Sequence, residues 1–229
     1  MLRAIIFDMD GVICDSEPLH MKAFQRVLTE EAIVITDQEY YDKYLAHDDR
    51  GSFEAAFQAR SRPEIDAQLM KSLLARKARY FDDLMKAHLV IYPGVDAFVR
   101  KALRRHALAV ASGARRLEVE FVLKKAKMRD CFTSVVSADE VKNGKPQPEA
   151  FQYALSLLNE RRLDGTPAIE PGQCLVIEDS PRCIRTARAL GMKTIGMASS
   201  YKAEELRDAD LVINSFVGFA LETAEKLFS

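Results

Sequence analysis

Short apolar runs recur along this chain, and helix-like segments separate them. Runs of this length, bounded by polar residues or glycine, are typical of strands buried on both faces of a parallel sheet. The expected strands are residues 2–7, 107–111, 133–136, 174–177, 194–197 and 211–213. The alternation predicts an α/β fold with a doubly wound, mostly parallel Rossmann-like sheet as its core. It does not indicate the order of the strands in that sheet.

The segment 16–85 interrupts this alternation because it contains no convincing strand. Apolar residues recur in it at helical spacing instead. One apolar face consists of Ala23, Phe24, Val27 and Leu28, and another of Ile65, Leu69, Leu73, Leu74, Phe81 and Leu84. Ser61 with Glu64 three residues later has the spacing of a capping box and predicts the start of the second helix. We therefore expect an α/β core formed by residues 1–15 and 86–229, with residues 16–85 inserted as a helical cap.

Composition and charge exclude several classes of protein. The chain has 229 residues, of which 48% are hydrophobic, so it is long enough to bury a sizeable core. Its 33 basic and 34 acidic residues nearly cancel, which argues against nucleic acid or an anionic membrane as a partner. No apolar run has the length of a membrane span or a signal sequence, and the four cysteines lack metal-site spacing. We expect a cytoplasmic monomer or small homo-oligomer that recognises its partner locally.

Two acidic residues, Asp8 and Asp10, lie at the carboxyl end of the first expected strand. Open α/β sheets bind their ligands at this edge. Two carboxylates so close to a buried strand repel each other and lose hydration, so they need a cation or a shared proton. Mg²⁺, which prefers hard oxygen ligands, meets this need. In isolation the same residues are equally consistent with a strand cap and a turn at Gly11.

Three further polar segments end expected strands or precede expected helices. Ser112-Gly113 offers a hydroxyl and free backbone amides to an anion, although Ser112 also fits a plain helix N-cap. Lys145 lies in a loop that neighbouring prolines restrict, although an isolated lysine is usually a surface residue. Glu178 and Asp179 form a second acidic pair at a strand end, although Asp179 or Ser180 also fits as a plain cap of the helix that Pro181 begins.

Together these segments resemble the four motifs of the haloacid dehalogenase superfamily. Residues 8–20, with the sequence DMDGVICDSEPLH, resemble the opening of the branch that contains phosphoglycolate phosphatases and β-phosphoglucomutases. The other motifs follow in the family's order, and the resemblance covers essentially the whole chain, the inserted helical cap included. It implies that Asp8 is a nucleophile and Asp10 a general acid and base. Ser112, with Gly113 beside it, is then expected to hold the phosphoryl group.

The same resemblance implies a magnesium site and a fixed cation beside it. Asp179 is expected as a direct Mg²⁺ ligand and Glu178 as a direct or water-mediated one. The Asp8 carboxylate and the Asp10 backbone carbonyl are expected to complete the protein ligands. Lys145 is expected to pair with the nucleophile and with phosphoryl oxygens. These roles predict a phosphoric monoester hydrolase that uses Mg²⁺ and acts on a small phosphorylated metabolite through an aspartyl-phosphate.

The cap of such enzymes sets substrate specificity, and the candidate residues for this role are His20, His47, Arg50 and Lys77. Each is also consistent with an ordinary position in a helix turn or on a solvated helix face. A β-phosphoglucomutase-like mutase is the alternative function, and it requires a second anion site, for which Arg50 and Lys77 are the suggestive residues. A non-catalytic binding protein is a third possibility, which the intact motifs make the weakest.

Overall fold

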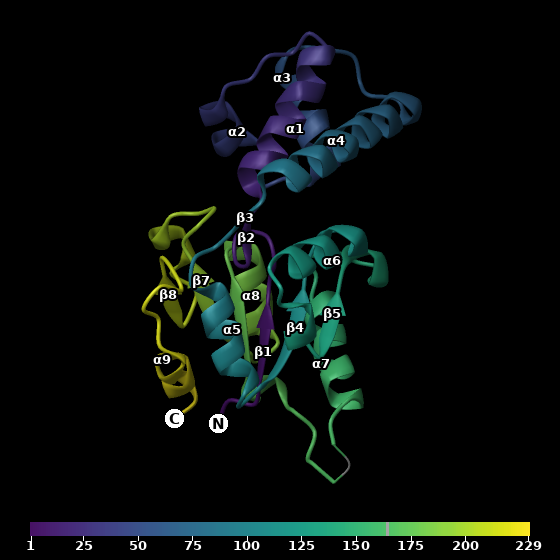
Figure 1. Ribbon diagram of the computed structural model, residues 1–229. Coiled ribbons are helices and arrows are strands. Elements are labelled where there is room, and N and C mark those ends of the chain that lie inside the picture. The colour runs from purple at the N-terminus through teal and green to yellow at the C-terminus, as the bar shows by residue number, and fades with distance from the viewer. Residues whose placement is uncertain (164) are drawn as a thin grey trace. The chain divides into compact units, whose positions relative to one another are not determined.

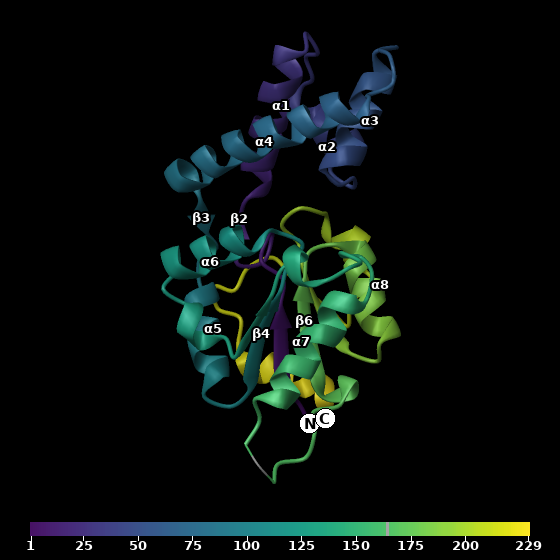
Figure 2. The ribbon, with the colours of Figure 1, turned by 90° about the vertical axis from the view of Figure 1, so that its right-hand side faces the viewer.

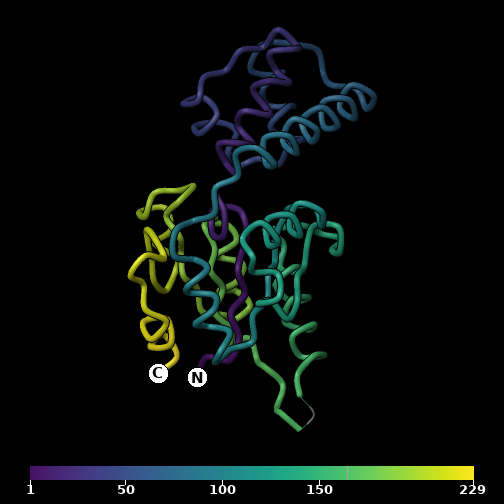
Figure 3. The backbone as a smooth tube through the Cα atoms, in the orientation of Figure 1, coloured from purple at the N-terminus to yellow at the C-terminus, as the bar shows by residue number. Residues whose placement is uncertain are grey.

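The computed structural model describes residues 1–163 and 165–229, which form two compact units. The first, the core, consists of Met1–Asp15 and Val90–Ser229, and the second, the cap, consists of Ser16–Leu89. Figure 3 follows the chain out of the core into the cap and back again. The return to the core occurs at Val90 and not at the expected residue 86, because the last cap helix, α4 (Ala67–His88), continues through that position.

The core contains, in its described residues, a six-stranded sheet in the order β5-β4-β1-β6-β7-β8 (Figure 1). Every neighbouring pair in this sheet is parallel. The strands are β1 (Ala4–Phe7), β4 (Ala107–Ala111), β5 (Ser134–Val136), β6 (Cys174–Glu178), β7 (Lys193–Met197) and β8 (Leu211–Ile213). The expected fold class, a mostly parallel Rossmann-like α/β core, is confirmed. The first expected strand begins two positions later than predicted, at Ala4.

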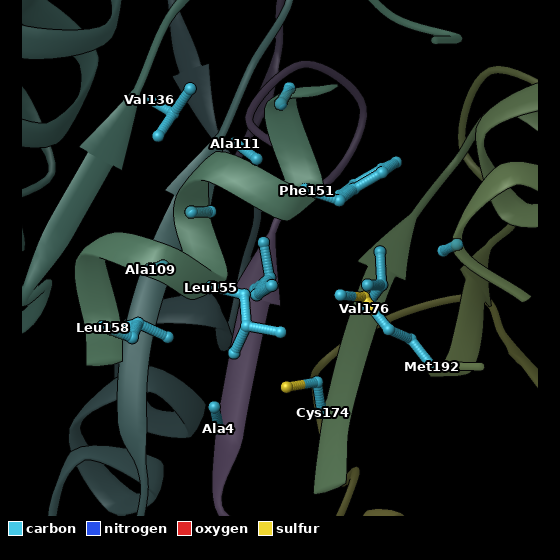
Figure 4. Packing of buried hydrophobic residues seen from close by; sticks show 14 of the residues in the cluster. Ala4, Ala109, Ala111, Val136, Phe151, Leu155, Leu158, Cys174, Val176 and Met192 are labelled. Atoms are coloured by element: carbon cyan, nitrogen blue, oxygen red, sulfur yellow. The ribbon is translucent and has the colours of Figure 1, made fainter. Parts of the chain in front are cut away.

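Helices cover both faces of this sheet, which is why its strands are mostly apolar. The core helices are α5 (Val95–Leu103), α6 (Arg116–Lys125), α7 (Glu149–Glu160), α8 (Pro181–Ala189) and α9 (Leu221–Glu225). Helices α7 and α8 lie on one face (Figure 2), where Phe151 and Leu155 of α7 pack against Ala4 and Val176 of the strands (Figure 4). On the other face the Phe7 ring meets the Phe98 ring of α5 edge-on, with centroids 6.2 Å apart.

A short antiparallel ribbon of β2 (Cys14–Asp15) and β3 (Val90–Ile91) belongs to the core and lies next to both connections to the cap. The cap itself consists of α1 (Glu17–Glu30), α2 (Asp37–Lys43), α3 (Asp49–Ala59) and α4. The prediction that Ser61 begins the last helix was wrong. The helix begins at Ala67, because Asp66 caps it with a side chain that accepts a hydrogen bond from the Leu69 N–H at 2.7 Å. Across the residues that the structure describes, no helix is both long and apolar enough to cross a membrane.

Candidate active site

The sheet order brings Asp8 and Glu178 to neighbouring strand ends. Strand β1 pairs with β6 so that Phe7 lies opposite Ile177, and the Asp8 N–H donates to the Ile177 carbonyl at 2.9 Å. Asp8 therefore leaves β1 at the level where Glu178 ends β6. Because the carboxyl ends of parallel strands meet at one edge of the sheet, two segments 170 residues apart meet at a single site.

Three carboxylates form a compact acidic cluster at this edge. One oxygen from each of Asp8, Glu178 and Asp179 lies within 4.8 Å of the other two, and all three side chains are buried. When ionised, three buried carboxylates repel each other strongly and lose hydration, so a divalent cation stabilises them. An all-oxygen donor set of this kind fits Mg²⁺. The three carboxylates expected as metal ligands are thus close enough together to share one ion.

Lys145 is the cation that the described residues place in this cluster. Its ammonium group donates to the Asp8 carboxylate at 2.7 Å and to the Glu178 carboxylate at 2.8 Å. The same group lies 4.8 Å above the centre of the Phe151 ring. Burial alone would lower the pKa of Lys145, but the negative charges of Asp8 and Glu178 outweigh it and raise that pKa. Lys145 therefore stays charged across the physiological pH range.

Asp8 has an unusually high proton affinity for a carboxyl group. Burial raises its pKa from 3.8 to about 7, and the charges of Glu178 and Asp10 act in the same direction. The ammonium group of Lys145 acts in the opposite direction without reversing the shift. A cation bound at the cluster would favour the ionised form, which is the nucleophilic one.

The turn after β1 needs glycine at position 11 for two physical reasons. Gly11 has a φ of +75°, a conformation that L side chains rarely adopt. A Cβ at this position would also lie 1.9 Å from Asp179 Oδ2. The Ser199 hydroxyl holds the turn by donating to the Gly11 carbonyl at 2.6 Å. The sequence indicated only a turn at Gly11 and missed Ser199, whose one signal is its place just after the expected strand 194–197.

Ser112 follows β4 directly, at the same edge of the sheet as Asp8. Its side chain is buried, and its hydroxyl accepts a hydrogen bond from the Ala114 N–H at 3.0 Å. The expected helix N-cap role of Ser112 was wrong, because α6 begins at Arg116 with Arg115 as its N-cap, and the contact from Ala114 closes a local turn instead. A hydroxyl that accepts one hydrogen bond can still donate its own proton to an anion. Gly113 is exposed, with open space where a Cβ would be.

The four cap candidates differ in their surroundings within the cap. Lys77, only 3% exposed, pairs with Asp49 at 2.8 Å and lies 2.6 Å from Nδ1 of His20. Burial and the charge of Lys77 lower the pKa of His20, so its neutral ring accepts a hydrogen bond from the ammonium group. Arg50 is exposed and lies 3.9 Å from Glu54. The fourth candidate, His47, is exposed in the turn before α3.

Residues 5–197 match the family model described as haloacid dehalogenase-like hydrolase. The chain belongs to this family. The haloacid dehalogenase resemblance inferred from the sequence motifs is thereby confirmed. The β-phosphoglucomutase from Clostridium difficile has the same fold as this haloacid dehalogenase-like chain, with a TM-score of 0.82 and 22% identity over 100% of this chain and 97% of that one.

Two curated relatives of this haloacid dehalogenase-like chain are named as phosphatases. The phosphorylated carbohydrates phosphatase of Thermotoga maritima is 29% identical over 195 residues, which cover 85% of this chain and 84% of the relative. Fructose-1-phosphate phosphatase YqaB of Escherichia coli is 31% identical over 195 residues, which cover 83% of this chain and 94% of the relative. The expected enzyme class, a phosphoric monoester hydrolase of this family, is confirmed at this level.

Proposed function

We propose that this chain is a Mg²⁺-dependent phosphatase that hydrolyses a small phosphomonoester, such as a sugar phosphate, through an aspartyl-phosphate on Asp8. The observation that carries the proposal is the acidic cluster of Asp8, Glu178 and Asp179, with Lys145 hydrogen-bonded to two of its members. The names of the curated relatives, which act on phosphorylated carbohydrates and on fructose 1-phosphate, support the substrate class. A cytoplasmic location belongs to the same proposal.

Asp8, Glu178 and Asp179 would hold the metal ion together with the Asp10 backbone carbonyl. When bound, Mg²⁺ supplies positive charge that neutralises the substrate phosphate and the carboxylates around it. Lys145 adds a fixed positive charge next to the nucleophile, where charge develops during phosphoryl transfer.

The chemical steps use two side chains from the turn after β1. Asp8 attacks phosphorus through a carboxylate oxygen, and the bond from phosphorus to the alcohol oxygen breaks. Asp10 donates its proton to the departing alkoxide, so the alcohol leaves neutral. Asp10 then accepts a proton from the water that attacks the aspartyl-phosphate, which releases phosphate and restores Asp8. The Ser112 hydroxyl and the amides beside Gly113 bind the phosphoryl oxygens in both steps.

A mutase is the competing function, and contacts within the cap argue against it. A mutase must hold a second phosphate, for which Lys77 and Arg50 were the suggestive cations. Asp49 and His20 already engage Lys77, and Arg50 is a largely exposed side chain near Glu54. A cation whose charge is balanced by a neighbouring carboxylate attracts a phosphate weakly. The cap therefore supports a leaving group without a second phosphate.

The test is hydrolysis of p-nitrophenyl phosphate and of a panel of phosphorylated metabolites, with Mg²⁺ and with EDTA. We expect Mg²⁺-dependent release of phosphate by the native chain and none by Asp8→Asn. The matched control is Asp96→Asn, which changes an exposed aspartate in α5 and should keep full activity. Mass spectrometry after an acid quench should find one phosphoryl group on the peptide that contains Asp8. Interconversion of glucose 1-phosphate and glucose 6-phosphate without phosphate release would favour the mutase instead.

A further inference from the structure

The loop that carries Lys145 is held in place by side chains from outside the acidic cluster. Lys145 lies between β5 and α7, in a segment without regular secondary structure. A lysine side chain has four rotatable bonds, so a loose loop would not keep its ammonium group within hydrogen-bonding distance of two carboxylates. Some part of the fold has to fix this loop.

Thr186 of α8 anchors the lysine loop at Pro146, the residue directly after Lys145. Its hydroxyl donates to the carbonyl of Pro146 at 2.7 Å, and the carbonyl of Arg182, one helical turn earlier, lies 3.2 Å from the same oxygen. A threonine hydroxyl has one proton, so the two carbonyls compete for it, and the shorter distance favours Pro146. A helical threonine normally bonds its own helix. Thr186 instead connects its helix to a loop 40 residues away.

The position of α8 makes this contact relevant to the acidic cluster. The helix begins at Pro181, two residues after Asp179, and continues from the strand that ends in Glu178. The hydrogen bond from Thr186 therefore joins the lysine loop to the helix that directly follows Glu178 and Asp179, two of the three carboxylates. Movement of the loop away from α8 would separate Lys145 from both of its partners.

A second anchor holds the start of the same loop. The Glu149 carboxylate, at the beginning of α7, accepts hydrogen bonds from the Lys142 N–H at 2.7 Å and from the Asn143 N–H at 2.9 Å. The Asn143 side-chain amide donates to the same carboxylate at 3.0 Å. These bonds fix the backbone before Lys145, whereas Thr186 fixes the backbone directly after it.

We infer that Thr186 is a positioning residue for Lys145. It holds the lysine loop against α8, so that the ammonium group stays between Asp8 and Glu178. This inference rests on the proposed function, in which Lys145 stabilises charge on the transferred phosphoryl group. Displacement of a catalytic group by about 1 Å commonly lowers the rate by about a hundredfold, and a loosened loop spends part of its time in place. Loss of the hydroxyl should therefore lower kcat by about tenfold.

The test compares two substitutions at Thr186 with a matched control. Thr186→Val removes the hydroxyl and keeps the shape, and Thr186→Ser keeps the hydroxyl. Thr29→Val is the control, because the Thr29 hydroxyl donates to the Gln25 carbonyl within its own helix, at 2.8 Å. We expect Thr186→Val to lower kcat for p-nitrophenyl phosphate about tenfold with little change in KM or in the half-saturating Mg²⁺ concentration. Thr186→Ser should restore most of the rate, and Thr29→Val should match the native chain.

A second measurement needs no activity and separates this inference from the proposed function. Reductive methylation, followed by mass spectrometry, reports how readily the Lys145 amine leaves its buried ion pairs. We expect faster methylation of Lys145 in Thr186→Val than in Thr29→Val, even if the native chain hydrolyses none of the phosphates offered. Equal methylation rates in the two variants overturn the inference. So does a kcat of Thr186→Val that equals that of Thr29→Val, or one that Thr186→Ser fails to raise.

Discussion

Replacing Gly11 with alanine places a methyl group in space that the Asp179 carboxylate occupies. The new Cβ would lie 1.9 Å from Asp179 Oδ2, whereas ordinary contact begins at 3.4 Å, so the carboxylate would have to retreat by about 1.5 Å. A metal–oxygen bond tolerates only a few tenths of an ångström. We therefore expect the half-saturating Mg²⁺ concentration to rise by about tenfold or more. The positive φ adds a backbone cost of about 1–2 kcal/mol for any L side chain.

Gly218→Ala separates the two effects. Gly218 has a φ of +74°, almost equal to that of Gly11, but nothing lies within 4 Å of its would-be Cβ. The shared backbone cost should lower the Tm of each variant by about 2–8 °C for a chain of this size, and Gly11→Ala should lose somewhat more because its methyl group also displaces the Asp179 carboxylate. Only Gly11→Ala should need more Mg²⁺.

The assay is p-nitrophenyl phosphate hydrolysis as a function of Mg²⁺ concentration, together with thermal unfolding in EDTA. Identical Mg²⁺ curves for Gly11→Ala and Gly218→Ala would refute the reasoning. They would mean either that Asp179 is not a metal ligand or that it binds the ion from a position the methyl group does not reach.

Three further predictions concern the buried charges. Lys145→Met should lower the free energy of unfolding of the metal-free protein by about 3 kcal/mol, because it leaves two buried carboxylates without their cation. Thermal unfolding should show that added Mg²⁺ recovers much of this lost stability. Lys77→Met should cost about 1–2 kcal/mol in urea unfolding, less than Lys145→Met, because the His20 ring loses its donor whereas the Asp49 carboxylate is half exposed and water can solvate it; a loss as large as that of Lys145→Met would contradict this. Burial raises the pKa of Asp8 from 3.8 to about 7. Between these two pH values, the folded metal-free protein therefore holds a proton on Asp8 that the unfolded chain has already lost. This contribution to stability is complete below pH 3.8 and is lost as the pH rises to about 7, so the stability of the native chain relative to Asp8→Asn should fall across the window in EDTA, and a flat difference would count against the shift.

The strands could be predicted from the sequence because burial on both faces leaves a direct signature in composition. Strand β4 was predicted at its observed residues, and β6 was predicted one residue short, because Glu178 still pairs in the sheet although its side chain is acidic. The start of α4 was predicted wrongly because Ser61 and Glu64 have the spacing of a capping box, yet Asp66 supplies the cap. Capping signals are short and recur by chance, whereas a run of buried apolar residues is long enough to be specific.

The contacts of the cap candidates could not be predicted from the sequence. Lys77 was recognised as a candidate, but its partner Asp49 lies in a different helix, and the sequence offers several acidic residues at comparable separations. Which one approaches Lys77 depends on how the helices pack. The contact of Thr186 could not be predicted either. In the sequence it is an ordinary helical threonine, and only the tertiary structure shows that its hydroxyl reaches the Pro146 carbonyl.

The sequence by itself determined the class of fold, the inserted helical segment and the residues that could carry phosphoryl-transfer chemistry, because hydrophobic period and motif spacing are local properties. Tertiary structure alone decided that β1 lies between β4 and β6, and hence that Asp8 meets Glu178, Asp179 and Lys145. Every order of these parallel strands buries nearly the same apolar surface, so hydrophobicity cannot select among them. Pairing, crossover connections and close packing make that choice, and with it they assemble the candidate site.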